Sequence, residues 1–541
     1  MEKTLILGNK PEKWWIKDLG ETDVLSVPNF SVGKNSDISN FVRELPKDID
    51  CVVIDADSLY TENIELPLDL ALQIRLMLRE CLHTSLSSII IVSDLSIEAF
   101  RDYGVKSMIL MTRKVSLVQS EVVCEVIRNS APLSPGEYVE GFLNLIKIEP
   151  QQKIEGRHSI ANEWGAERLG SVVCPDRKSE IIPLKTSSSL YFRYCDLVSL
   201  NADEIRGIIN CKSQERIESK EIESDGVKFL LIDDEADKGW LKVLSALMPD
   251  AEYDVWDTPI HSYEEISPEI RNNIKSRKYD LIFLDLRMAG VSEESVLNPE
   301  DFSGMRILRG IKKVNRGIQV IMLTATNKAW NLKALLDAGA NGYYMKESPE
   351  YHFPVTYSEQ NANALIDTIV ACLDNSYLQD IVARMAQLRL PDDSECSDNI
   401  YNQLKIALSL ILKAKTNADY AFAYISLEQV FEIATSSLIR QSWNSGRCEF
   451  FFTEDTHEKC RLIEGGKDKG LLDSAAQWKK VSAIYYQLYG GDDCKFSTKA
   501  EALISLRNKY IHPGKEDKPV ITQDDFQNLF DVIVQFLSVF K

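Results

Sequence analysis

The stretches VKFLLID (residues 227–233), YDLIFLDL (279–286), IQVIMLTA (318–325) and NGYYMK (341–346) are short apolar runs separated by helical patterns. One of these helical patterns is KGWLKVLSALM (238–248). Short apolar strands that alternate with helices are typical of parallel βα units. The sequence therefore predicts a doubly wound α/β domain over residues 226–375.

Polar residues stand at the ends of these predicted strands. Asp233 and Asp234 end the first strand, Asp285 the second, Thr324 the third and Lys346 the fourth. In an open parallel sheet, ligands bind at the carboxyl ends of the strands, so we expect these side chains to share one edge. Three carboxylates in one pocket repel one another and call for a divalent cation such as Mg²⁺, which prefers oxygen ligands. A nucleophilic carboxylate beside a hydroxyl and an amine suits phosphoryl transfer onto Asp285.

The same residues resemble the receiver domain of bacterial response regulators over residues 226–350. The matches are the acidic pair, the acceptor in LDLRM, the hydroxyl in MLTA and the lysine after GANGYY. The resemblance implies a flavodoxin-like fold, phosphorylation of Asp285, and a histidine kinase or another phosphodonor as partner. The site residues that it implies are the Mg²⁺ ligands Asp233, Asp234, Asp285 and Arg287 (by its backbone carbonyl) and the switch residues Thr324, Tyr343 and Lys346. Taken alone, the residues also fit a plain doubly wound fold with acids at its strand ends.

Two features depart from the receiver pattern. Glu347 follows the lysine, where the family usually has proline. The loop AGVSEESVLNPEDFSG (289–304) is longer than usual and lacks the proline common after the acceptor. Neither change removes a residue of the predicted site, but the family's usual partner surface and dephosphorylation rate are not carried over to this chain.

Residues 1–140 show a similar alternation. KTLILG (3–8), CVVID (51–55), SSIIIVS (87–93) and KSMILM (106–111) are predicted as strands, with LALQIRLMLREC (70–81) as a helix. Asp55 stands at an acceptor-like position, Ser93 at that of the hydroxyl and Lys114 at that of the lysine, but Gly8-Asn9 replaces the acidic pair. The segment thus resembles a degenerate receiver that binds Mg²⁺ poorly and serves contact rather than chemistry. An unrelated α/β domain is the alternative.

Two further segments complete the chain. Residues 141–225 are predicted as a connecting region, with a helix at RHSIANEWGAERLG (157–170) and a charged linker at its end. Residues 376–541 carry apolar residues at three- and four-residue spacing, which predicts an all-helical domain.

LISLRNKYIHPG (503–514) places Arg507, Asn508 and His512 on the penultimate predicted helix. This pattern resembles the ribonuclease motif of HEPN domains, which are helical bundles that usually act as dimers. The resemblance implies a metal-independent endoribonuclease effector and a homodimer, and other receiver–HEPN combinations point to stress or anti-phage defence. Histidine suits proton transfer and arginine suits stabilisation of a charged phosphorane. The alternative is a non-enzymatic adaptor whose helical domain mediates dimerisation or binds a protein or nucleotide.

Composition limits the remaining possibilities. The chain has 541 residues, which predicts three or four domains, and its net charge of −20 argues against a general DNA binder but leaves room for a local RNA site. Its eleven cysteines include no CxxC pair, which indicates reduced thiols rather than a disulfide framework. No run of 18 apolar residues and no signal peptide are evident, so we expect no membrane span and a cytoplasmic location.

Overall fold

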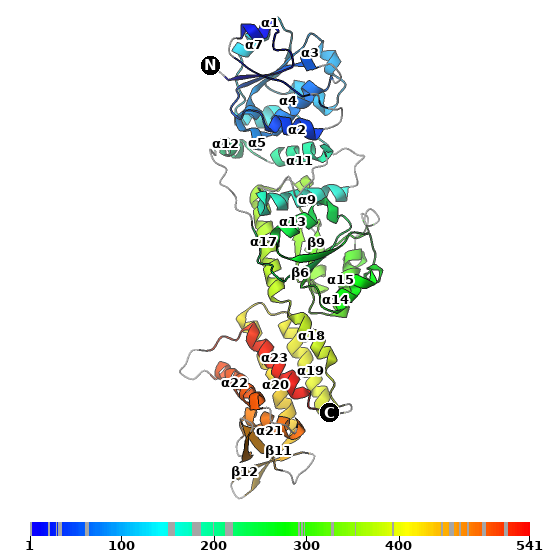
Figure 1. Ribbon diagram of the computed structural model, residues 1–541, viewed down its shortest axis with the longest axis vertical. Helices are drawn as coiled ribbons and strands as arrows, with labels where there is room; N and C mark the ends of the chain where they lie inside the picture. Colours follow the sequence, from blue (N-terminus) through cyan, green and yellow to red (C-terminus); the bar gives the residue numbers. More distant parts are fainter. Residues whose placement is uncertain are drawn as a thin grey trace. The chain divides into compact units, whose positions relative to one another are not determined.

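The computed structural model divides the chain into two compact units (Figure 1). The first comprises residues 1–310 and 319–373, and the second comprises residues 311–318 and 374–541. The residues that the structure describes are 3–19, 22–28, 30, 35–59, 64–149, 157–175, 186–198, 200–210, 220–289, 293, 296, 298–325, 329–351, 353–391, 394–444, 447–453, 459–464, 467–472, 475–489, 494–512 and 518–540.

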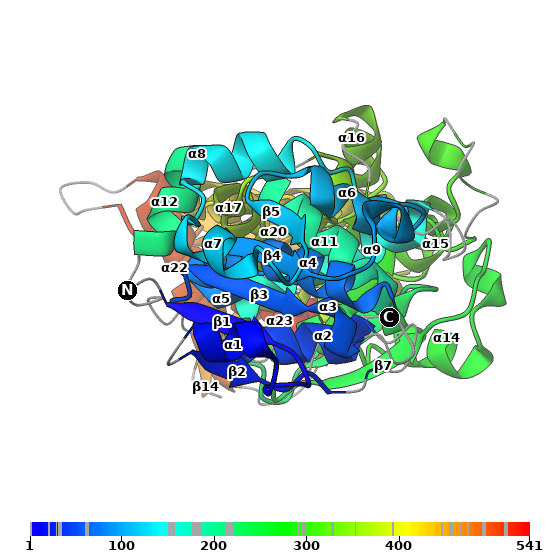
Figure 2. The same cartoon turned by 90° about the horizontal axis from the view of Figure 1, so that it is seen from above.

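The first unit contains two sheets, of which the N-terminal one has five parallel strands in the order β2–β1–β3–β4–β5. Figure 2 shows these strands side by side in that order. The order is that of flavodoxin-like doubly wound sheets. The strands are β1 (Thr4–Leu7), β2 (Asp23–Leu25), β3 (Cys51–Asp55), β4 (Ser88–Val92) and β5 (Val115–Val118).

Helices cover both faces of this sheet. Leu5 and Leu7 belong to a core that includes residues of two helices, whereas Ile6 between them belongs to a core with residues of two others. Successive strand residues point to opposite faces, which is why the central strands β1, β3 and β4 are apolar over most of their length. The helices on the first face are α2 (Asn35–Arg43) and α4 (Leu66–Leu76), and those on the second are α1 (Trp14–Asp18) and α7 (Val123–Arg128).

The prediction of a strand at residues 106–111 is wrong. This segment forms the short helix α6 (Val105–Met108) and a 3₁₀ turn η3 (Ile109–Met111). Ile109 is buried, but Met111 is 78% exposed, so the run does not lie inside a sheet. A short apolar run does not by itself distinguish a strand from a helix.

The connecting region contributes packed helices to the first unit. They are α9 (Arg157–Val173), α11 (Thr186–Val198) and α12 (Ala202–Asn210). Leu169 of α9 joins the core of the second sheet, whereas Leu197 of α11 and Ile205 of α12 join that of the first. Trp164 and Phe192 pack edge to face with ring centroids 5.2 Å apart, which joins α9 to α11.

The second sheet is also parallel and has the order β10–β9–β8–β6–β7. Phe229, Phe283 and Leu323 of its strands form a core with residues of α9, α13 and α17. The strands are β6 (Lys228–Ile232), β7 (Glu252–Trp256), β8 (Leu281–Asp285), β9 (Gln319–Thr324) and β10 (Gly342–Met345). The helices are α13 (Trp240–Leu247), α14 (Pro268–Lys275), α15 (Ser303–Val314), α16 (Ala329–Asp337) and α17 (Val355–Asp374).

The second unit is rich in helices but is not all helical, which corrects the prediction for residues 376–541. Two antiparallel hairpins, β11–β12 and β13–β14, lie between α20 and α21 in the chain. The hairpin strands are β11 (Ile439–Asn444), β12 (Arg447–Phe452), β13 (Arg461–Glu464) and β14 (Lys467–Leu471). The helices are α18 (Leu378–Gln387), α19 (Glu395–Ile411), α20 (Asn417–Leu438), α21 (Gln477–Tyr489), α22 (Cys494–Ile511) and α23 (Gln523–Leu537).

The helices of the second unit share one apolar core that includes Tyr424, Phe431, Ile504 and Phe536. Within the described part of the chain, no helix is both long enough and apolar enough to span a bilayer.

Candidate functional site

The carboxyl edge of the second sheet brings an amine between two carboxylates. The Lys346 ammonium lies 2.9 Å from Asp233 Oδ2 and 2.7 Å from Asp285 Oδ1. Asp285 is the last residue of β8, and the other two residues directly follow β6 and β10. All three are almost completely buried. Burial alone would lower the pKa of Lys346, but the two carboxylates raise it, so the amine is charged.

Asp234 lies beside this ion pair and is less well satisfied. Its Oδ1 is buried and has no hydrogen-bond partner among the described residues. Burial, followed by the neighbouring carboxylates of Asp285 and Asp233, raises the pKa of Asp234 to about 7. An unpartnered carboxylate oxygen next to two further carboxylates is a donor set that suits a hard divalent cation. The three carboxylates do not converge as they would around a bound metal: Lys346 lies between Asp233 and Asp285, and no group of three or more metal-binding side chains is gathered among the described residues.

Backbone contacts fix the acceptor. The amide of Arg287 donates a 2.8 Å hydrogen bond to Asp285 Oδ2, so both oxygens of that carboxylate have partners. A Cβ on Gly304 of α15 would lie 2.2 Å from the carbonyl oxygen of Asp285, so only glycine allows this close approach. The amide of Lys346 donates a 2.7 Å hydrogen bond to the carbonyl of Thr324, which aligns the ends of β9 and β10.

The unusually long loop after the acceptor supplies one ordered contact. Glu293 is buried and accepts hydrogen bonds from the amide and the hydroxyl of Ser303, at 2.6 and 2.8 Å. Ser303 Oγ in turn accepts from the amide of Met288 at 2.8 Å. Glu293 was not predicted from the sequence, because a single acid in a loop gives no periodic signal. It secures the chain three residues after Asp285.

The predicted switch aromatic points outward. Tyr343 in β10 is 39% exposed, whereas the next residue, Tyr344, is buried against Trp240 with ring centroids 5.8 Å apart. Trp330 of α16 is 60% exposed.

Helix α9 adds a residue that the sequence did not predict. Asn162 Oδ1 accepts a 2.5 Å hydrogen bond from Lys346, and the Asn162 amide donates to the carboxylate of Glu235. Asn162 is completely buried. It precedes the receiver-like segment in the chain, so neither strand order nor motif spacing could have pointed to it.

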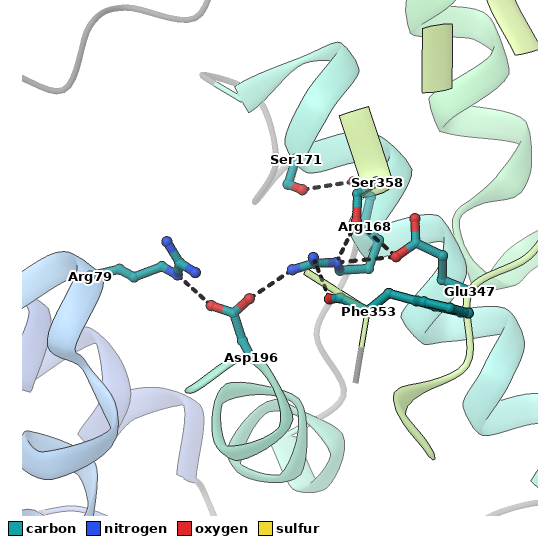
Figure 3. Close-up of polar contacts among 7 residues, drawn as sticks. All are labelled: Arg79, Arg168, Ser171, Asp196, Glu347, Phe353 and Ser358. Carbon is teal, nitrogen blue, oxygen red and sulfur yellow. Dashed lines mark hydrogen bonds and ion pairs between the residues drawn. The ribbon is translucent and has the colours of Figure 1, made fainter. Parts of the chain in front are cut away.

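Glu347 stands where receivers usually have proline. Figure 3 shows that it is a partner of Arg168, which lies on α9 like Asn162. The Arg168 guanidinium lies 3.4 Å from Glu347 Oε2, donates to Ser358 Oγ at 3.1 Å, and lies 2.7 Å from Asp196 Oδ1. Asp196 of α11 also accepts a 2.5 Å hydrogen bond from Arg79. The departure from the family pattern therefore has a specific partner within the chain.

The N-terminal sheet offers a different arrangement at the corresponding edge. Asp55 is buried and pairs with the Lys13 ammonium at 2.6 Å. Ser93 donates to Asp57 at 2.8 Å. Asn9, where an acidic residue would stand, uses its side-chain oxygen to accept hydrogen bonds from the hydroxyl of Ser26 and the amide of Val27. Lys114 directly precedes β5, so it lies at the opposite, amino edge of the sheet. Its predicted position as the lysine of this edge is wrong, because the strand predicted at residues 106–111 is helical.

The predicted ribonuclease residues lie at the end of α22. Arg507 pairs with two glutamates of α20, at 2.8 Å from Glu432 Oε1 and 3.5 Å from Glu428 Oε2. Burial, opposed by Arg507 and assisted by Glu432, raises the pKa of Glu428 to about 7. Asn508 accepts a 3.1 Å hydrogen bond from the Arg507 guanidinium. His512 lies just past the end of α22, not within the helix, and is exposed.

Comparison with known proteins identifies one part of the chain. Residues 229–353 match the family described as response regulator receiver domain. No curated protein matches the chain.

Solved structures similar to this chain include two response regulators and NtrX. A CheY-like response regulator receiver domain protein from Methanospirillum hungatei is 20% identical, covers 28% of this chain and 95% of its own, and has a TM-score of 0.19. A two-component response regulator from Clostridium difficile is 22% identical, with coverage of 26% and 96% and a TM-score of 0.17. NtrX from Brucella abortus in complex with ATP is 21% identical, with coverage of 34% and 35% and a TM-score of 0.22. From the family match, residues 229–353 of this chain form a response regulator receiver domain.

Proposed function

We propose that the chain is a phosphorylation-regulated signalling protein in which Asp285 accepts a phosphoryl group from a histidine kinase or another phosphodonor. The observation that carries this proposal is the Lys346 ammonium held between Asp233 and Asp285, at the carboxyl ends of neighbouring parallel strands. A carboxylate oxygen of Asp285 attacks the phosphorus of the donor, the bond to the donor's leaving group breaks, and an acyl phosphate forms.

The residues around the acceptor divide the remaining work. Lys346 pairs with the incoming phosphoryl oxygens, since it already lies 2.7 Å from the acceptor oxygen. The hydroxyl of Thr324 donates a hydrogen bond to the new phosphoryl group, and Tyr343 turns inward from its exposed position. Asp233, Asp234, Asp285 and the backbone carbonyl of Arg287 would hold Mg²⁺. Bound there, the ion supplies positive charge that offsets the repulsion between the acids and the phosphoryl oxygens.

Labelling of the full-length protein tests this assignment. Incubation with acetyl phosphate and Mg²⁺ should attach one acid-stable but alkali-labile phosphoryl group per chain. Asp285→Asn should remove the labelling, whereas Asp57→Asn, at the edge of the N-terminal sheet, should retain it. Labelling of Asp285→Asn to the wild-type extent would show that another residue is the acceptor.

We propose that the second unit, rich in helices and called the helical unit here (residues 311–318 and 374–541), is the effector. Two functions compete for it. The adaptor function is favoured by Arg507, which is committed to Glu428 and Glu432 within the chain and is only 21% exposed. The endoribonuclease function is favoured by His512, which is exposed at the end of the same helix. A homodimer would bring a second copy of both residues to the site.

Cleavage of labelled RNA with and without phosphodonor distinguishes the two functions. An endoribonuclease loses cleavage in His512→Ala and keeps phosphorylation of Asp285. If the unit is an adaptor, wild type and His512→Ala should show the same RNA cleavage, or none, under every donor condition.

A further inference from the structure

Helix α9 is docked on the receiver domain although it lies outside the residues that match the family. Ala166, Leu169 and Val173 are buried in the same apolar core as the strands of the second sheet. The approach is close, because a Cβ added to Gly165 would lie 3.2 Å from the Trp240 ring and 3.3 Å from the backbone of Glu347. Glu347 directly follows Lys346, so the helix presses on the strand end that carries the site lysine.

Asn162 reaches from this helix into the site itself. The Lys346 ammonium has three hydrogens, and three acceptors surround it, namely Asn162 Oδ1, Asp233 Oδ2 and Asp285 Oδ1, at 2.5, 2.9 and 2.7 Å. The donor capacity of the lysine is therefore filled in this state. Because Asn162 also donates to Glu235, its own side chain is held in orientation.

Phosphorylation of Asp285 requires this arrangement to change. One oxygen of the carboxylate becomes the bridging oxygen of the acyl phosphate, and Lys346 must donate to a phosphoryl oxygen instead. Asp285 is 1% exposed and Lys346 1% exposed, so a phosphodonor cannot reach the acceptor while the site is covered. The bond from Lys346 to Asn162 opposes both the movement of the lysine and the opening of the site.

From these contacts we infer that Asn162 is a positioning residue that holds Lys346 in its unphosphorylated geometry, so that phosphorylation is coupled to release of helix α9. The inference rests on the proposed function of Asp285. Arg168 extends the coupling, because six residues further along α9 it pairs with Glu347 and, through Asp196, is linked to Arg79. Movement of α9 therefore reaches the helices packed on the N-terminal sheet.

The rate of labelling by acetyl phosphate in the presence of Mg²⁺ tests the inference on the full-length chain. Asn162→Ala should be labelled about tenfold faster than wild type, which corresponds to about 1.4 kcal/mol. Ser171→Ala is the matched control, because its hydroxyl lies on the same helix and, among the described residues, donates only to the carbonyl of Arg168, at 2.7 Å. This control should be labelled at the wild-type rate.

The outcomes separate this inference from the proposed function. If wild type and Asn162→Ala are labelled equally fast, or the variant more slowly, and Asp285→Asn is not labelled, the inference is wrong and the proposed function stands. If Asp285→Asn is labelled like wild type, or no protein is labelled, both are wrong.

Hydrogen exchange of the unmutated protein tests the release of α9 directly. If α9 and Asn162 had only a structural role, exchange in α9 would not respond to a bound phosphoryl analogue. Addition of beryllofluoride, which mimics the phosphoryl group, together with Mg²⁺ should accelerate amide exchange in α9. Exchange in α14 should stay unchanged, because α14 contributes no residue to the core that α9 shares. Equal exchange in α9 with and without beryllofluoride, while the analogue is bound, would overturn the coupling.

Discussion

Replacement of Glu428 by glutamine should change how the stability of the helical unit depends on pH. Glu428 is completely buried on α20, and neither of its carboxylate oxygens has a hydrogen bond among the described residues. The charge of Arg507 lies 3.5 Å away, which offsets only part of the cost of burial. The pKa of Glu428 is therefore raised to about 7 from its ordinary value of 4.5.

The direction of the effect follows from the raised pKa. Between pH 4.5 and about 7 the folded protein holds a proton on Glu428 that the unfolded chain has lost, so the free energy of unfolding falls as the pH rises through this window. Below pH 4.5 there is no such cost, and above pH 7 it is fully present. The gap in pKa corresponds to about 3 kcal/mol. For a unit of this size, that is a shift of about 6–12 °C in the unfolding midpoint.

Calorimetry of the full-length protein from pH 5 to pH 8 measures this shift. The transition of the helical unit should move to lower temperature with rising pH in wild type, and the movement should be much smaller in Glu428→Gln. Glu432→Gln is the control: it removes the other carboxylate next to Arg507 but leaves the buried carboxyl of Glu428, so most of the pH dependence should remain. Parallel pH profiles of wild type and Glu428→Gln would refute the reasoning.

Two further predictions concern the acceptor loop and the effector. Gly304→Ala should slow phosphorylation by at least tenfold and lower the free energy of unfolding by about 1–3 kcal/mol, because the new Cβ meets the backbone of Asp285 at 2.2 Å. In the control Gly207→Ala the new Cβ meets no atom within 4 Å, so neither quantity should fall. Labelling measures the first quantity and calorimetry the second. In the effector, Arg507→Ala should lower the melting temperature because it leaves Glu428 buried without its charged partner, whereas His512→Ala should not, since that side chain is exposed. If the unit cleaves RNA, both variants should lose cleavage and keep labelling of the receiver; equal melting temperatures of the two variants would contradict the role given to the ion pair.

The parts of the fold that sequence reasoning predicted are those with strong local signals. Asp233, Asp285 and Lys346 were placed together because buried parallel strands end at one edge of a sheet, and the structure brings them within hydrogen-bond distance. The edge strands β2 and β7 were not predicted, since both are partly exposed and lack a continuous apolar run. The edge strand β5 was not predicted either, because the apolar run at residues 106–111 was taken as the strand. The two hairpins were missed because they interrupt a long series of helical patterns.

The contacts of α9 could not be predicted from local signals. Asn162 lies on a helix that precedes the receiver domain, and nothing in its neighbouring residues indicates a contact with Lys346. In the sequence Glu347 is only a departure from the receiver pattern. In the structure it is the partner of Arg168. Long-range polar pairs of this kind carry no periodicity, so they emerge only from the tertiary fold.

The central claim is that Asp285 is the phosphorylated residue, and identification of the modified residue tests it most directly. Full-length protein is labelled with acetyl phosphate and Mg²⁺, the acyl phosphate is reduced with borohydride, and the position of the resulting homoserine is determined by peptide mass spectrometry. The account predicts reduction at Asp285 alone, with Asp233, Asp234 and Asp55 unmodified. Modification of one of those three residues in place of Asp285 would contradict the account.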